Sequence, residues 1–257
     1  MKVSREKIGN AEVRVWRGGK GAPLLYLHGF EQHPGGAPFL EKLCETFEVC
    51  APESPGFGHS AGLDEMNDLL DMALHIRAVV EGWDRGAVNV IGHSLGGMFA
   101  AELAVIAPQL TERLVLVDPF GLWLDDEPLP DPFIQAPDAL AKLKWHNPAN
   151  ANKEPSAFDE MTDGSRHTFR TINLSAATKY LWPIPDRGLA RRARYIQAPT
   201  LILHGESDRL IPLRYSEALA KLIPGAEMRR LRDAGHYPMI EAEEPFLDAV
   251  QSFFLVP

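Results

Sequence analysis

The chain has 257 residues, of which 45% are hydrophobic and 24% are charged, and its formal net charge at pH 7 is -9. This length and composition suffice for the core of one domain, and the acidic excess argues against nucleic acid and anionic membrane surfaces as partners. The two cysteines are too few for a disulfide framework, and no stretch approaches the roughly 20 apolar residues that cross a bilayer.

The first seven residues lack the apolar run of a signal peptide, so we expect a cytoplasmic protein. Beyond them, apolar and β-branched runs predict an opening hairpin and then strands that alternate with helices. The predicted strands cover residues 11–16, 24–27, 47–51, 88–91, 114–117, 200–203 and 227–231. The predicted helices cover residues 37–46, 65–81, 95–106, 213–222 and 243–254. This alternation indicates a doubly wound α/β fold with a mostly parallel sheet, in which ligands bind beyond the carboxyl ends of the strands.

One segment, residues 119–195, interrupts the alternation of strands and helices. It is rich in proline and contains no convincing apolar strand, yet it carries Trp123, Trp145 and Trp182 among other large apolar residues. Such a composition is not typical of a disordered linker, so the segment is expected to pack on the rest of the protein. We therefore predict a core of residues 1–118 and 196–257, with residues 119–195 inserted as a helical cap, or lid, over the active site.

The most informative motif is Gly92-His93-Ser94-Leu95-Gly96, a G-x-S-x-G pentapeptide between a predicted strand and a predicted helix. A sharp turn from strand to helix exposes the serine hydroxyl at the edge of the sheet. The two glycines let the backbones of strand and helix approach without a Cβ clash. Ser94 is therefore the candidate nucleophile.

A serine hydroxyl needs a base within hydrogen-bond reach and a third group that orients the base. His236 follows the last predicted strand, and Asp208 follows the strand before it, so both lie in loops where ligands are expected. Asp118 and Asp233 remain alternatives to Asp208 as the group that orients the base. Three other histidines are less suited as the base, because they flank the nucleophile or end strands: His28, His93 and His204.

Attack on a carbonyl group creates an oxyanion, which backbone N–H groups near the start of a helix can stabilise. Leu95, directly after the candidate nucleophile, supplies one such N–H group. The second is expected from the loop after the strand at residues 24–27, where Phe30 follows His28-Gly29.

At these residues the chain resembles the α/β-hydrolase superfamily over essentially its whole length. The likeness is carried by Leu27-His28-Gly29-Phe30, Pro55-Gly56-Phe57-Gly58-His59-Ser60, the serine pentapeptide, and the runs from Leu203 to Pro212 and from Gly235 to Pro238. The resemblance implies an eight-stranded core sheet with a cap inserted after the sixth strand. It also implies Ser94 as nucleophile, Asp208 as orienting acid, His236 as base and water as the final acceptor. Members that cleave epoxides or carbon–halogen bonds use aspartate as nucleophile, so Ser94 argues against both reactions.

Residues 181–189 resemble capped bacterial hydrolases whose relatives split carbon–carbon bonds in products of aromatic-ring breakdown. Such enzymes usually carry tryptophan after the catalytic histidine and an arginine in the cap that binds a substrate carboxylate. Here Tyr237 takes the tryptophan's place, and Arg166 and Arg170 could bind a carboxylate. The candidate substrate contacts are Trp123, Trp182, Arg166, Arg170 and Tyr237.

The function expected from the sequence is hydrolysis of a small carboxylic ester with an apolar acyl or aryl group, through an acyl-enzyme on Ser94 and with neither metal nor organic cofactor. The alternatives are a carbon–carbon bond hydrolase of ring-cleavage dienoates, a lactonase or a thioesterase. A non-catalytic receptor for small molecules is a further alternative, because a fold does not determine a function. The sequence leaves open whether the protein is a monomer or a homo-oligomer.

Overall fold

The computed structural model describes residues 1–31, 34–35, 37–153 and 163–255, without the side chains of residues 152, 163–167 and 169. The strands are β1 Lys2–Ile8, β2 Ala11–Gly18, β3 Ala22–Leu27, β4 Phe47–Pro52, β5 Val88–His93, β6 Thr111–Val117, β7 Thr200–Gly205 and β8 Glu227–Leu231. The helices are α1 Pro38–Leu43, α2 Leu69–Trp83, α3 Leu95–Ile106, α4 Pro137–Lys144, α5 Asp163–Leu181, α6 Leu189–Arg192, α7 Leu213–Leu222, α8 Pro238–Glu241 and α9 Glu243–Phe254.

In this part of the chain the strands form a single eight-stranded sheet in the order β1-β2-β4-β3-β5-β6-β7-β8. The hairpin of β1 and β2 forms one edge, and β2 also runs antiparallel to β4. The pairs from β4 through β8 are parallel. The mostly parallel, eight-stranded sheet expected from the sequence is therefore confirmed.

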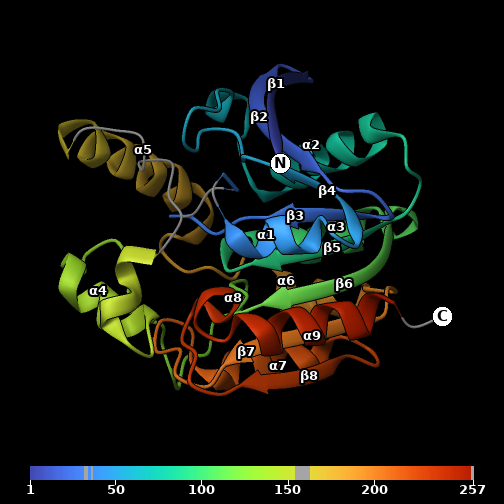
Figure 1. Ribbon diagram of the computed structural model, residues 1–257. Coiled ribbons are helices and arrows are strands. Elements are labelled where there is room, and N and C mark those ends of the chain that lie inside the picture. Colours follow the sequence, from blue (N-terminus) through green and yellow to red (C-terminus); the bar gives the residue numbers. More distant parts are fainter. Residues whose placement is uncertain (32–33, 36, 154–162, 256–257) are drawn as a thin grey trace.

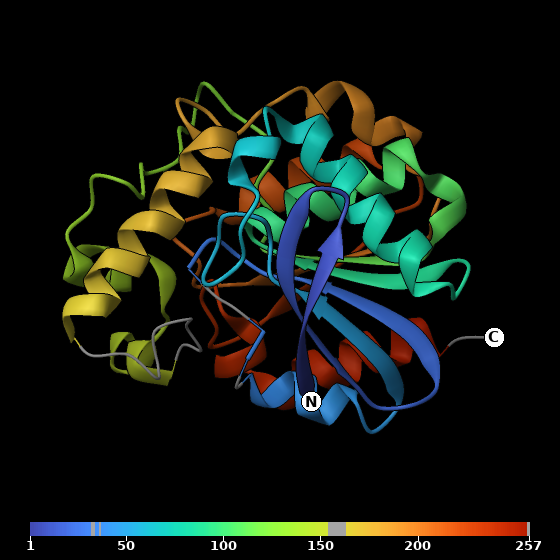
Figure 2. The same ribbon diagram turned by 90° about the horizontal axis from the view of Figure 1, so that it is seen from above.

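Helices cover both faces of the sheet (Figures 1 and 2). On one face, α2, α3 and α7 contribute to a large apolar core with side chains such as Met72, Phe99 and Leu219. On the other face, α1 and α9 pack a second core around Phe39 and Phe246. The strands between them are buried on both sides, which is why they appear in the sequence as continuous apolar runs.

The chain between β6 and β7 contains helices and no strand among its described residues. Figures 1 and 2 show α4 and α5 beyond one end of the sheet, on the side where the parallel strands finish. The helix α6, in contrast, packs against α3 in the layer that covers the sheet. No helix in the described residues has the length and the hydropathy needed to cross a membrane.

The elements differ from the sequence prediction mainly at the sheet edge and at helix ends. The strand β1 was not predicted, because its residues are mostly exposed and charged, as is common for an edge strand. The predicted helix start at Glu65 is wrong: α2 begins at Leu69, after Asp68 accepts hydrogen bonds from the N–H groups of Leu70 and Asp71. An aspartate that caps the first turn in this way sets the start of a helix.

Candidate active site

Ser94 lies at the turn between β5 and α3, with a φ of 57° and a ψ of -118°. A non-glycine residue in such a sparsely populated region is strained by roughly 1–3 kcal/mol and persists only where its surroundings hold it. The N–H group of Ser94 donates to the carbonyl oxygen of Val117 at 2.9 Å. A Cβ atom at Gly96 would collide with the carbonyl oxygen of Leu27, and one at Gly92 would collide with the carbonyl oxygen of Gly96. The glycines thus permit the tight turn that presents the hydroxyl group.

The structure brings three of the predicted site residues together. His236 Nε2 lies 2.8 Å from Ser94 Oγ, and His236 Nδ1 lies 2.7 Å from Asp208 Oδ2. The other carboxylate oxygen of Asp208 accepts hydrogen bonds from the N–H groups of Leu210 and Ile211, at 2.8 and 3.0 Å. With its Nδ1–H group donated to the carboxylate, the imidazole keeps Nε2 as an acceptor for the serine proton. This arrangement can turn the hydroxyl group into a nucleophile.

The backbone of His236 is held from two sides. Its N–H group donates to the carbonyl oxygen of Lys144, the last residue of α4, at 2.5 Å. Its carbonyl oxygen lies 2.7 Å from Nε2 of His93. Burial is the main cause that lowers the pKa of His93 well below its usual value, so the ring is neutral and donates Nε2–H to that oxygen. His93 therefore supports the loop of the candidate base.

The residues after α4 are also bonded to this loop. Glu241, in α8, accepts hydrogen bonds from the N–H groups of Gly235 and His146, at 2.8 and 2.9 Å. His146 Nδ1 in turn lies 2.8 Å from Ser207 Oγ, in the loop of the candidate acid. We call residues 143–150 the α4 anchor, because they connect α4 to the loops of both the base and the acid.

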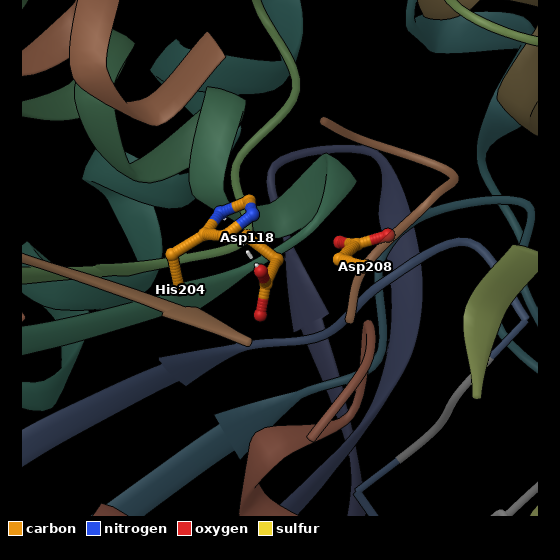
Figure 3. Close-up of side chains that lie close together, drawn as sticks. All are labelled: Asp118, His204 and Asp208. Carbon is orange, nitrogen blue, oxygen red and sulfur yellow. Dashed lines mark ion pairs between the residues drawn. The ribbon is translucent and has the colours of Figure 1, made fainter. Parts of the chain in front are cut away.

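Neither alternative to Asp208 contacts the imidazole of His236 in the structure. Asp118 is buried beside His204, and Figure 3 shows Asp208 across from this pair. Asp118 Oδ1 accepts the N–H group of Gly205 at 3.0 Å and lies 3.0 Å from His204 Nδ1. Burial, followed by the nearby Asp208, raises the pKa of Asp118 well above its usual value, which favours the neutral carboxyl group. Asp233 has a side chain that is 87% exposed and lies 3.8 Å from an imidazole nitrogen of His146.

Asp118, His204 and Asp208 also offer a group of potential metal ligands, with atoms that lie within 4.8 Å of one another. Both oxygen atoms of Asp208 already accept N–H groups, from His236 and from the backbone, and Asp118 Oδ1 accepts the N–H group of Gly205. Burial lowers the pKa of His204 to about 4, so its ring is neutral. The three side chains are best described as a hydrogen-bonded group behind the candidate base.

The two predicted oxyanion donors belong to the start of α3 and to the loop after β3. Leu95 is the first residue of α3, where N–H groups point out of the helix. A Cβ atom at Gly29 would lie 3.2 Å from the Cβ atom of Ser94, so the loop after β3 packs directly on the serine. Phe30, the next residue, is 2% exposed. The start of α3 and the loop after β3 thus meet at the serine.

The two predicted tryptophan contacts line one small cavity of about 70 Å³. Phe120 also lines it, and its ring centroid lies 6.3 Å from that of His236. Trp182 stands at the surface, with 59% of its area exposed. Apart from Asp131, the walls of the cavity are apolar: Phe120, Trp123, Leu129, Pro130, Pro132, Phe133, Leu181, Trp182, Pro183 and Pro185.

Arg170 belongs to a cluster of charged side chains next to the oxyanion loop. Its Nε donates to Glu31 at 3.1 Å, while Lys144 Nζ donates to the other oxygen of Glu31 at 2.5 Å. Lys144 Nζ also lies 3.3 Å from the hydroxyl group of Tyr237, which is buried. The side chain of Arg166, the other predicted carboxylate ligand, lies outside the described residues. Two cations thus share one carboxylate here.

Sequence reasoning missed Glu31, Lys144 and Glu241. Glu31 and Lys144 are 113 positions apart in the chain, and no local pattern links them. One signal was present: Glu31 follows the predicted oxyanion donor directly, and an acidic residue there needs a cation if it is buried.

Comparison with known proteins gives one family and several relatives. A model described as the alpha/beta hydrolase family matches residues 24–249. A 2-hydroxy-6-oxo-6-(2'-aminophenyl)hexa-2,4-dienoic acid hydrolase from Metapseudomonas resinovorans is 26% identical, over 95% of this chain and 88% of the relative. Lipase 1 from Psychrobacter immobilis is also 26% identical, over 91% of this chain and 77% of the relative.

A similar solved structure is that of 2-hydroxy-6-oxo-6-phenylhexa-2,4-dienoate hydrolase from Rhodococcus sp. strain RHA1. The two chains superpose with a TM-score of 0.81 at 18% sequence identity, and 99% of each chain is covered. This likeness extends the agreement in fold to the whole described chain.

Proposed function

The chain belongs to the alpha/beta hydrolase family, and on that premise we propose that it is a serine hydrolase. Its substrate in this proposal is a small carboxylic ester with an apolar acyl or aryl group, cleaved through an acyl-enzyme on Ser94. The observation that carries the proposal is the pair of bonds at His236, 2.8 Å to Ser94 Oγ and 2.7 Å to Asp208 Oδ2. These bonds supply a base for the hydroxyl group and an acid that orients the base.

In the first half-reaction, Ser94 Oγ attacks the ester carbonyl carbon while its proton passes to His236 Nε2. The N–H groups of Leu95 and Phe30 stabilise the oxyanion of the tetrahedral intermediate. As the intermediate collapses, the carbon–oxygen bond to the alcohol breaks, and the alcohol leaves with the proton from His236. Water then attacks the acyl-enzyme, with His236 again as base, and releases the carboxylic acid and the serine.

An apolar group on the substrate is supported by the cavity beside Phe120. Its walls are mostly aromatic residues and prolines, and its volume of about 70 Å³ suits a short acyl group. Trp123 and Trp182 would contact that group. This assignment makes the cavity the specificity pocket for the acyl side.

We also propose that residues 119–195 act as the cap and that residues 1–118 and 196–257 form the core. Contacts of α4 and α5 with the proposed core support this division: the N–H group of His236 donates to Lys144, and that of Gly58 donates to Asn173 Oδ1 at 2.8 Å. A cap that excluded water from the reacting atoms would strengthen every charge interaction there.

Cleavage of a carbon–carbon bond is the second candidate. It is favoured by the relative whose name is that of a dienoic acid hydrolase, and by Arg170, whose side chain is 31% exposed beside a second cation. A guanidinium group in this position could bind the carboxylate of a dienoate. The name Lipase 1 of another relative supports the ester reaction instead. Lactones and thioesters would use the same residues.

The test is a panel of p-nitrophenyl butyrate, a ring-cleavage dienoate, a lactone and a thioester, with the wild type and Ser94→Ala. We expect turnover of p-nitrophenyl butyrate, and a loss in Ser94→Ala of more than about three decades in kcat. Strong turnover of the dienoate with negligible ester cleavage would replace the ester proposal by the second candidate.

Labelling with a fluorophosphonate separates an enzyme from a receptor. We expect the label on the wild type and none on Ser94→Ala. A serine that does not react, in a protein that binds small molecules tightly, would contradict the proposed hydrolase.

A further inference from the structure

Lys144 contacts two loops of the active site through different atoms. Its carbonyl oxygen accepts the N–H group of His236 at 2.5 Å. Its ammonium group donates to Glu31 at 2.5 Å and lies 3.3 Å from the hydroxyl group of Tyr237. Only 7% of its side chain is exposed. A lysine this deeply buried is normally paired, and here the pairing joins α4 to the core.

Glu31 is the receiving group on the oxyanion loop. Burial alone would raise the pKa of Glu31, but the neighbouring Lys144 and Arg170 outweigh burial and bring the pKa below its usual value. The carboxylate is therefore ionised, and both of its oxygen atoms bind cations. Because Glu31 directly follows Phe30, a fixed Glu31 side chain restricts the backbone that carries the second oxyanion donor.

The contact of Lys144 with the histidine loop is similarly close. A Cβ atom at Gly235 would collide with the carbonyl oxygen of Lys144, so only glycine lets the two backbones approach. The preceding residue, Leu143, accepts the N–H group of Arg209 at 3.0 Å, beside the candidate acid. The end of α4 thus lies against the loops of both the base and the acid.

We propose that Lys144 is a positioning residue, which aligns the oxyanion hole at Phe30 with the base at His236. The inference rests on the proposed function, because it assigns those two roles. Oxyanion donors act over a narrow range of distance, and a displacement of about 1 Å can lower a rate about 100-fold. A residue that bonds the backbone of the base and the loop of the oxyanion donor determines their separation.

The test compares Lys144→Met, Lys144→Arg, Glu31→Gln and the double variant Lys144→Met/Glu31→Gln. Lys142→Met is the matched control, because Lys142 lies on the same helix with an exposed side chain. We expect Lys144→Met to lower kcat about 10- to 100-fold with KM within about threefold, since alignment matters most in the transition state. The double variant should recover part of the loss, because it no longer leaves a buried carboxylate short of a cation. Lys144→Arg should lose less than Lys144→Met, and Lys142→Met should match the wild type.

Inhibition by phenylboronic acid distinguishes a positioning role of Lys144 from a merely structural role. It forms a tetrahedral adduct with the serine, so its inhibition constant should rise in Lys144→Met in proportion to the fall in kcat/KM. Circular dichroism and the Tm establish that each variant is folded. If Lys144→Met does not fold, the proposal is tested by comparing kcat and boronate inhibition of Lys144→Arg and of the double variant with those of the wild type. Unchanged kcat and boronate inhibition in a folded variant without the ammonium group would overturn the proposal.

The rate of fluorophosphonate labelling separates this inference from the proposed function. Labelling needs the base and the oxyanion hole but no particular substrate. A wild type that is labelled but cleaves no ester would overturn the ester assignment, while slower labelling of Lys144→Met would still support the positioning role. Equal labelling rates in the two proteins would overturn the positioning role alone, and a wild type that is not labelled would overturn both.

Discussion

Two carboxyl groups lie close together behind His236, and that of Asp208 is bonded to the imidazole. Asp208 accepts an N–H group of the imidazole and two from the backbone. Asp118 is fully buried, its Oδ2 has no hydrogen-bond donor within the described residues, and its pKa is raised by burial and by Asp208. A proton on Asp118 would allow that oxygen to donate toward Asp208.

Exchanging each carboxyl group for an amide should separate their roles. Asp208→Asn places a donor where the imidazole needs an acceptor, so kcat should fall about 10⁴-fold. Asp118→Asn replaces a neutral group by a neutral group that can still accept from Gly205 and donate to Asp208, so kcat should stay within about tenfold. The measurement is kcat for an ester at pH 7. An equal loss in both variants would mean that an ionised Asp118 is required.

The sequence predicts those candidate site residues that lie in recognisable local patterns. Ser94, Asp208 and His236 each follow a strand, and their order along the chain suggested which of nine histidines to choose. The partners of Glu31 could not be found in the same way. Whether an acid is surface-exposed or buried between two cations depends on the path of α4 and α5, and that path follows no short motif.

At the scale of elements, the approach of α3 to β3 positions the serine turn. Gly96, in the first turn of α3, lies against the carbonyl oxygens of Leu27 and His28 at the end of β3. Any side chain at this position meets backbone rather than a side chain that could rotate away. The helix can therefore approach the strand only through glycine.

Gly96→Ala should lower the free energy of unfolding by about 1–3 kcal/mol, because the added methyl group overpacks the contact of helix and strand. It should also lower kcat, since the turn that carries Ser94 must shift. Gly82→Ala is the control: a Cβ atom there has no atom within 4 Å, so alanine in α2 should leave stability unchanged or raise it by up to about 1 kcal/mol. Urea denaturation measures both variants. Equal stability of the two variants would show that the close contact at Gly96 is not limiting.

The elements were predicted best where burial is strongest. The strands β5, β6 and β7 are apolar because both faces are covered, so their runs stand out. The strand β1 shows no such run, and its register comes from pairing with β2. The short helix α8 was not predicted either, because its four residues are too few for a periodic pattern.

At the scale of the whole molecule, buried histidines link stability to pH. Burial lowers the pKa of His75, in α2, to about 4 from the usual 6.5. In the unfolded chain this imidazole binds a proton below about pH 6.5, whereas in the folded protein it stays neutral until about pH 4. The unfolded state therefore binds more protons in this window, and stability falls as the pH falls from 6.5 to 4. His204, with a pKa of about 4, acts in the same direction.

His75→Gln should reduce the loss of unfolding free energy between pH 6.5 and 4 by about 3 kcal/mol, because glutamine does not titrate. Urea denaturation at several pH values gives the free energies. The same slope in His75→Gln and the wild type would show that His75 is not protonated on unfolding.

Within the proposed cap, we expect amino-acid substitutions in the α4 anchor to affect activity differently from substitutions elsewhere. Residues 143–150 bond to the loops of the base and the acid, so substitutions there would disturb the chemistry itself. Trp182 is 59% exposed and lines the cavity proposed for the acyl group. A mutant library meant to broaden substrate scope should therefore randomise Trp123 and Trp182 and keep the α4 anchor intact. Engineers would then alter selectivity without sacrificing turnover.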